Sequence, residues 1–169
     1  GEQIPPELLP RRIRVLGHVA ILWLDSQIVH HKHLIGQTTL KFNEKIKSVL
    51  LRTEAIAGPY RQPAVELIAG SSKTETMFRE NKVIFHLDPQ KVMFSVGNKA
   101  ERQHMSQFGS GELVVDMFAG IGQLSLPMAV HSHPKHIHAI EWNPDAYYYL
   151  EKNIQANQVS EFVQPHLGD

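Results

Sequence analysis

The chain has 169 residues, no cysteine and a formal net charge of zero, with 17 basic and 17 acidic side chains. This length is sufficient for a hydrophobic core in one domain or in two small ones, and the absence of cysteine excludes a disulfide framework and a thiolate metal site. No apolar run approaches the roughly 20 residues that span a bilayer, and no leading signal segment is visible, so we expect a cytoplasmic protein without membrane contact.

Charge is distributed unevenly along the chain. Residues 1–110 contain 15 of the 17 Lys and Arg but only 10 of the 17 Asp and Glu, whereas residues 111–169 contain 2 basic and 7 acidic side chains. A basic front half joined to an acidic back half is typical of a polyanion-binding module attached to a catalytic one, although an excess this modest also arises by chance. Contact with nucleic acid is therefore one prediction for the front half.

Residues 1–90 are predicted to form a small α+β domain. A β-rich stretch over 13–24 is followed by a helix over 26–42 that Ser26 is placed to cap, although Gly36 weakens the helical pattern. The short connections that follow predict an antiparallel sheet, whose strands lie over 48–51, 64–69, 74–78 and 83–87.

The remaining residues, 91–169, alternate between strands and helices. Asn98 is placed to cap a helix over 99–108, and strand, helix, strand, helix and strand then follow over 113–116, 123–130, 136–140, 143–157 and 162–167. This β-α-β-α-β order predicts a parallel, doubly wound sheet. Three strands make only the first, cofactor-binding half of such a fold, so we expect the natural polypeptide to continue beyond residue 169.

The turn after the strand over 113–116 is the most informative segment. It reads Asp116-Met-Phe-Ala-Gly-Ile-Gly122, and Gly120 and Gly122 let the backbone approach a ligand closely. The next predicted strand ends at Glu141, whose carboxylate can accept hydrogen bonds from both hydroxyls of a ribose. An ordinary strand-to-helix turn accounts for the glycines but not for this acidic pair, so the pattern predicts a nucleotide-like cofactor.

Residues 92–102, 114–122 and 140–144 together carry a resemblance to a known family. They resemble the tRNA wybutosine-synthesising enzymes that transfer the aminocarboxypropyl group of S-adenosylmethionine, and the related tRNA guanine-N1 methyltransferases that modify the base next to the anticodon. Residues 58–63 and 65–68 resemble the small domain that both families place before the catalytic domain. The resemblance implies a Rossmann-like class I methyltransferase fold, S-adenosylmethionine as co-substrate, no metal, and the anticodon region of tRNA as partner.

Gly97 helps to choose between the two relatives. The methyltransferases usually carry Phe-Ser-Pro-Arg-Leu where this chain has Phe-Ser-Val-Gly-Asn, so Gly97 stands in place of their arginine. Trp142 points the same way, because the methyltransferases more often have leucine there. The resemblance therefore favours transfer of the 3-amino-3-carboxypropyl group to a tricyclic wyosine-type guanosine, with release of methylthioadenosine. Two alternatives stay open: a guanine-N1 methyltransferase, and a noncatalytic fragment that binds cofactor or RNA.

The resemblance also implies roles for individual residues in cofactor binding, while the catalytic residues stay unknown. Arg102 would hold the carboxylate of the methionine arm, with the Ser95 hydroxyl at the same end. Glu141 would bind the ribose, and Asp169 the adenine amino group. Residues of the turn and its surroundings complete the predicted set: Asp116, Phe118, Ala119, Gly120, Gly122 and Trp142. The two aromatic rings could pack against cofactor or core, and core is the favoured position for Phe118.

The histidines are not predicted to bind a metal. Those between 131 and 138 span a turn and the start of a strand, on the side away from the expected site, and their spacing does not match a zinc site. Those between 30 and 33 are neighbours on a predicted helix and cannot share one face, so we expect them at the surface.

Overall fold

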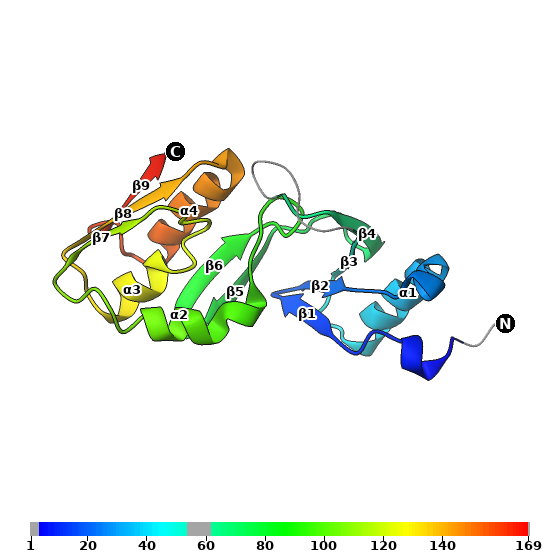
Figure 1. Ribbon diagram of the computed structural model, residues 1–169. Coiled ribbons are helices and arrows are strands. Elements are labelled where there is room, and N and C mark those ends of the chain that lie inside the picture. The colour runs from blue at the N-terminus through cyan, green and yellow to red at the C-terminus, as the bar shows by residue number, and fades with distance from the viewer. Residues whose placement is uncertain (1–3, 54–61, 169) are drawn as a thin grey trace.

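The computed structural model describes residues 4–53 and 62–168, and it shows an elongated molecule with one sheet domain at each end and a hairpin between them (Figure 1). Residues 58–61 and Asp169, which entered the predictions, lie outside the described residues. The elements of the front part are η1 (Pro6–Leu8), β1 (Ile13–Leu16), β2 (Val19–Leu22), η2 (Ser26–His31), α1 (Lys32–Phe42), β3 (Ser48–Arg52), β4 (Val65–Gly70), β5 (Thr76–Glu80) and β6 (Val83–Leu87). Those of the back part are η3 (Val96–Asn98), α2 (Lys99–Met105), β7 (Leu113–Asp116), α3 (Ser125–His131), β8 (His136–Glu141), α4 (Pro144–Ala156) and β9 (Val163–Leu167).

The four strands predicted to form one antiparallel sheet divide between two sheets, since β3–β4 and β5–β6 are antiparallel pairs as predicted but β4 does not pair with β5. The front sheet is mixed. Its strand order is β1-β2-β3-β4, and β2 pairs with β3 in parallel while the two outer pairs are antiparallel. The physical reason is the connection between β2 and β3, which contains α1 and carries the chain back to the end where β2 began. The strands themselves lie close to where the sequence places them.

The predicted helix over 26–42 is divided into a 3-10 segment, η2, and the α-helix α1. Its cap is Asp25 rather than Ser26, because Asp25 is the last extended residue and its Oδ1 accepts a hydrogen bond from the Gln27 N–H at 2.9 Å. Gly36, which weakens the helical pattern, has a packing role: a Cβ at this position would lie 2.9 Å from the Ala69 Cβ. The glycine therefore lets α1 pack closely on β4.

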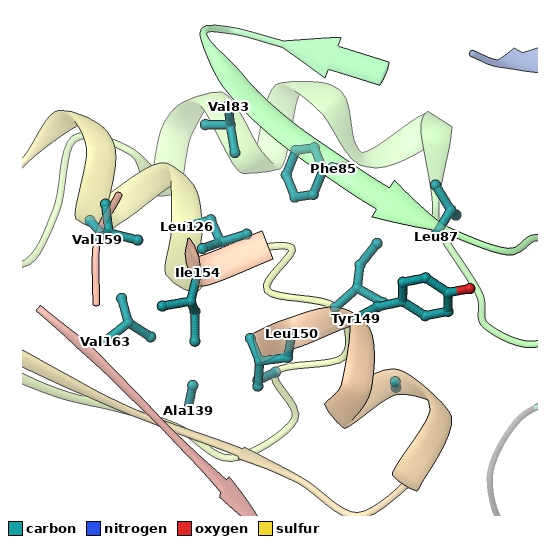
Figure 2. Packing of buried hydrophobic residues seen from close by; sticks show 14 of the residues in the cluster. Val83, Phe85, Leu87, Leu126, Ala139, Tyr149, Leu150, Ile154, Val159 and Val163 are labelled. Atoms are coloured by element: carbon teal, nitrogen blue, oxygen red, sulfur yellow. The ribbon is translucent and has the colours of Figure 1, made fainter. Parts of the chain in front are cut away.

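The back part has two layers of strands with helices between them (Figure 1). Strands β7, β8 and β9 form the predicted parallel sheet, and α4 contacts β9 on one side and β6 of the antiparallel β5–β6 hairpin on the other. Figure 2 shows Val83 and Phe85 of β6 facing Leu126 and Ile154 of the helices. The hairpin thus shares its core with the parallel sheet, and the predicted division at residue 90 stays a prediction.

Two asparagines of α4 bind the backbone of β6 as a neighbouring strand would. Asn153 accepts from the His86 N–H at 2.6 Å and donates to the His86 carbonyl at 3.1 Å. Asn157 does the same at Ile84, with distances of 2.8 and 2.7 Å. The spacing matches, since residues four apart on a helix rise ~6 Å and residues two apart on a strand rise ~6.6 Å. We call these four hydrogen bonds the asparagine ladder.

Asn153→Ala should lower the thermal stability strongly. Asn153 is fully buried and also donates to the Ile121 carbonyl at 3.0 Å, so its removal leaves three backbone groups without partners. We expect a loss of about 2–4 kcal/mol, which for a chain of this size corresponds to a melting temperature lower by roughly 5–15 °C. Gln155→Ala, at an exposed position of the same helix, is the matched control. Equal melting temperatures of the two variants would show that the asparagine ladder does not contribute to stability as expected.

Candidate functional site

The candidate site lies where β7 and β8 end. The two strands are parallel neighbours, with Asp116 paired to Ala139, so their carboxyl ends meet at one edge of the sheet. Asp116 closes β7 and Glu141 closes β8, and the turn that leads to α3 lies between them in sequence. This edge is where ligands of open parallel sheets bind.

Glu141 links the turn to the end of its own strand. Its Oε2 accepts a hydrogen bond from the Gly120 N–H at 2.7 Å, and its Oε1 accepts one from the Asn143 N–H at 2.7 Å. An ionised carboxylate has about four acceptor positions, so roughly two remain for the hydroxyls of a ribose. We refer to this pair of hydrogen bonds as the Glu141 clamp. The chemistry of the donor set therefore fits the role that the resemblance implies.

The two glycines of the turn are needed for different reasons. Gly120 has a φ of +57°, a left-handed conformation that a side chain disfavours. Gly122 combines a φ of +92° with close packing, because a Cβ there would lie 2.6 Å from the Leu126 Cδ1. The residue before them, Ala119, has a buried side chain and belongs to the hydrophobic core. The tight turn thus requires glycine at positions 120 and 122.

Asp116 organises the start of the turn. Its Oδ2 accepts a hydrogen bond from the Ser125 hydroxyl at 2.5 Å, and its Oδ1 accepts one from the Phe118 N–H at 3.3 Å. Ser125 is fully buried at the first residue of α3, so the carboxylate ties the end of β7 to the beginning of the helix. Ser125 was not predicted as part of the site, although a serine shortly after the two glycines could have indicated a hydrogen bond to Asp116.

The aromatic residues lie outside the core, which corrects the favoured position of Phe118. Its side chain is 88% exposed, and that of Trp142 is 47% exposed. The reason is the geometry of the turn, in which buried Ala119 takes the inward direction and its neighbour points away from the sheet. Both rings are therefore accessible to a ligand at the ends of β7 and β8.

Arg102 is already paired within the protein, which the sequence did not predict. It is 2% exposed, and it donates to Glu80 through Nε at 2.7 Å and through Nη2 at 3.1 Å. Its guanidinium carbon also lies 4.3 Å from the ring centroid of Phe94. The resemblance implied that Arg102 would bind the carboxylate of the methionine arm through two hydrogen bonds. In the structure, the carboxylate of Glu80 occupies that position instead. This geometry does not favour Arg102 as a direct ligand of the methionine carboxylate.

Arg102 instead positions the loop that contains Ser95. Its Nη1 donates to the Ser95 carbonyl at 2.7 Å, while the Ser95 N–H donates to the side-chain oxygen of Gln123 at 3.3 Å. The hydroxyl of Ser95 makes no hydrogen bond within the described residues. Gln123 belongs to the same turn that Glu141 binds, so Ser95 and Glu141 are both attached to this turn. Neither Gln123 nor Glu80 was predicted.

Asn98 does not cap α2, contrary to the prediction. Its side chain makes no capping hydrogen bond, because the 3-10 turn η3 precedes α2 and Asn98 already has a near-helical conformation with φ −88° and ψ 24°. Gly97, in the same turn, is exposed, and a Cβ built there would have open space around it. Asp169 lies outside the described residues.

The histidines that were considered for metal binding lie elsewhere. His131 ends α3 and His136 begins β8, so both are at the opposite end of the sheet from Glu141. Within residues 4–53 and 62–168, no three His, Cys, Asp or Glu side chains are grouped so that they could hold a metal ion. Over the same residues, no helix is both long enough and apolar enough to cross a membrane.

Glu80→Gln should destabilise the protein and loosen the Ser95 loop. The change leaves the buried guanidinium of Arg102 without a counter-charge, which costs on the order of 3–5 kcal/mol in chemical denaturation. Glu75→Gln is the matched control, because Glu75 is 46% exposed and pairs with Lys152 at the surface, where the loss should stay below ~1 kcal/mol. Equal unfolding free energies for the two variants would refute the role of the buried pair.

Comparison with known proteins places the chain in a family. Residues 76–169 match the TRM5/TYW2 methyltransferase domain, and residues 1–74 match the TYW2 N-terminal domain. A curated relative from Pyrococcus horikoshii, a tRNA(Phe) (4-demethylwyosine(37)-C(7)) aminocarboxypropyltransferase, is 41% identical over 173 residues, covering 100% of this chain and 61% of that protein. The chain spans about half the length of other curated relatives that it matches.

Solved structures agree with the sequence matches. P. horikoshii TYW2 in complex with MeSAdo superposes with a TM-score of 0.82 at 35% identity, covering 99% of this chain and 60% of that one. The complex of aTrm5 with tRNALeu gives a TM-score of 0.87 at 31% identity, covering 96% and 48%. These matches confirm the predicted Rossmann-like methyltransferase fold with a small domain before it. The chain therefore belongs to the TRM5/TYW2 methyltransferase family.

Proposed function

We propose that the complete protein binds S-adenosylmethionine at the ends of β7 and β8 and transfers its 3-amino-3-carboxypropyl group to tRNA. The acceptor is a tricyclic wyosine-type guanosine next to the anticodon. The observation that carries the proposal is the Glu141 clamp, which combines a carboxylate suited to a ribose with a glycine turn at the edge of a parallel sheet. The proposal is also supported by a relative: this chain is 41% identical to a protein named as an aminocarboxypropyltransferase.

The residues of this chain would act by binding and orienting the co-substrate. Glu141 would hold the ribose, and the free hydroxyl of Ser95 would bind the methionine end, with Arg102 as a positioning residue behind it. S-adenosylmethionine supplies a sulfonium with three attached carbons, so the carbon aligned with the nucleophile is the one transferred. In the proposed reaction, a carbon of the base attacks the methylene of the methionine arm, the bond to sulfur breaks, and methylthioadenosine leaves. The base carbon then loses its proton, which restores the aromatic ring.

Gly97 supports this reaction over methyl transfer. In the guanine-N1 methyltransferases that the chain resembles, an arginine usually stands at this position, and here the position is exposed and open. Without that cation, the chain lacks one group that the methyltransferases place near the base. The match of residues 1–74 to the TYW2 N-terminal domain points in the same direction. Methyl transfer stays the second candidate, because the family model for 76–169 covers both kinds of enzyme.

Glu141→Ala should weaken binding of S-adenosylmethionine by the complete protein. Loss of the hydrogen bonds between the carboxylate and the ribose costs about 1–3 kcal/mol, or roughly 5- to 150-fold in Kd by calorimetric titration. The Kd of the Glu141→Gln variant should lie between those of the unchanged protein and of Glu141→Ala, because an amide offers a single acceptor oxygen. Glu161→Ala removes an exposed carboxylate away from the turn and serves as the control. If all three variants bind as tightly as the unchanged protein, Glu141 is not a ribose ligand.

Two labels should identify the group that is transferred. With S-adenosylmethionine labelled at the carboxyl or at the methyl carbon, and tRNA that carries the tricyclic base, the carboxyl label should enter the RNA while the methyl label stays in released methylthioadenosine. Methyl label in the RNA would instead establish the methyltransferase. Intact cofactor binding with neither label in the RNA would support the noncatalytic alternative.

A further inference from the structure

The side chain of Gln123 joins two segments of the candidate site that are far apart in the chain. Its Oε1 accepts a hydrogen bond from the Ser95 N–H at 3.3 Å, and its Nε2 donates one to the Met93 carbonyl at 3.4 Å. Gln123 itself belongs to the glycine turn, residues 117–124, where its own N–H donates to the Ala119 carbonyl at 3.3 Å. One side chain therefore connects the glycine turn with the Ser95 loop, residues 93–95.

The carboxamide of Gln123 uses both its oxygen and its nitrogen in this connection. The carbonyl and the N–H that it binds lie on either side of Phe94, and a carboxamide presents an acceptor and a donor side by side to meet them. The same nitrogen lies beside Gly120, because a Cβ built on this glycine would be 3.5 Å away from it. Since Gly120 donates its N–H to Glu141, the amide contacts both the Ser95 loop and the residue that Glu141 binds.

The Ser95 loop has a second attachment, which does not involve the turn. Arg102 donates to the Ser95 carbonyl at 2.7 Å, and buried Phe94 has the Arg102 guanidinium carbon 4.3 Å from its ring centroid. Among the described residues, both hydrogen bonds between the loop and the glycine turn are made by Gln123. Removal of its amide should therefore leave the loop folded on Arg102 and free its distance from the turn.

The distance between the loop and the turn matters for a ligand that reaches both. In the proposed function, Glu141 holds the ribose of S-adenosylmethionine and Ser95 binds its methionine end. The product methylthioadenosine keeps the ribose but has lost the amino acid arm. A side chain that fixes the distance between the two binding groups lowers the cost of ordering the site for the first ligand, and it contributes nothing to the second.

We propose that Gln123 is a positioning residue that couples the Ser95 loop to the glycine turn, so that the site favours S-adenosylmethionine over methylthioadenosine. The inference rests on the proposed function, since it takes the co-substrate and the product of that reaction as ligands. It goes further by assigning the discrimination between substrate and product to a side chain that aligns the two ends of the ligand. Binding of the co-substrate and release of the product are then controlled by one internal contact.

Calorimetric titration of the complete protein with both ligands tests the discrimination. Gln123→Met keeps the length of the side chain and removes both hydrogen bonds, so the Kd of S-adenosylmethionine should rise roughly 3- to 10-fold while that of methylthioadenosine changes less than about 2-fold. The same substitution at Gln155, an exposed residue of α4, should change neither Kd. Glu141→Ala should raise both Kd values by a similar factor, because both ligands contain the ribose.

A second variant keeps half of the contact. Gln123→Glu retains an acceptor for the Ser95 N–H and loses the donor to the Met93 carbonyl, so the ratio of the two Kd values should change less than in Gln123→Met. The ratio is the informative quantity, because a general loss of stability would affect both ligands alike. Equal changes of both Kd values in the two Gln123 variants, or no change in either value, would overturn the proposal.

Hydrogen exchange at single amides tests the coupling itself. Methylthioadenosine binds on the Glu141 side of the site, so an effect on the Ser95 amide is expected to pass through Gln123. Saturating methylthioadenosine should slow exchange of the Ser95 amide in the unchanged protein and leave it unaffected in Gln123→Met. The Gly120 amide, which donates to Glu141, should be slowed in both proteins. Slowing at Ser95 that persists in the variant would refute the coupling.

Two results separate this inference from the proposed function. If the unchanged protein transfers the carboxyl label to tRNA but Gln123→Met keeps the same ratio of the two Kd values, the positioning role is wrong and the proposed function stands. If the unchanged protein binds neither S-adenosylmethionine nor methylthioadenosine, the proposed function fails and the role of Gln123 fails with it.

Discussion

The asparagine ladder is the interaction on which the arrangement of the back part depends. A helix and a strand seldom exchange regular hydrogen bonds, because the helix backbone satisfies its own groups. Here Asn153 and Asn157 present side-chain amides at the repeat of the strand, so α4 completes the open edge of β6. The hairpin is thereby held by directional contacts as well as by the packing of Phe85 and its neighbours in the core (Figure 2).

Fixing the hairpin has consequences for the candidate site. Glu80, the last residue of β5, holds the buried guanidinium of Arg102, and Arg102 in turn holds the carbonyl of Ser95. From the other side, the Glu141 clamp holds the turn whose Gln123 accepts the Ser95 N–H. The loop at Ser95 is thus fixed by two chains of contacts, one from the hairpin and one from the parallel sheet. Preorganisation of this kind reduces the cost of ordering the loop when a ligand binds.

The sequence predicted what depends on local patterns. Alternating strands and helices predicted the parallel sheet, and the spacing of the glycines and Glu141 predicted an edge that the structure builds as expected. The sequence did not predict Glu80 as the partner of Arg102, because the two residues are 22 positions apart in the chain. A lone arginine on a helix is usually exposed to solvent, and no local pattern indicated otherwise. The exposure of Phe118 and the parallel pairing of β2 with β3 were also missed, since both follow from how the chain turns in three dimensions.

Hydrogen exchange of single amides tests the central claim most directly. If the ladder joins the hairpin to the parallel sheet in one cooperative unit, the Ile84 and His86 amides, which donate to Asn157 and Asn153, should exchange only through global unfolding. Their free energies of opening should equal that of Ile137 in β8, whose amide donates to Phe162. Exchange of Ile84 and His86 through a smaller, local opening while Ile137 stays protected would contradict the account.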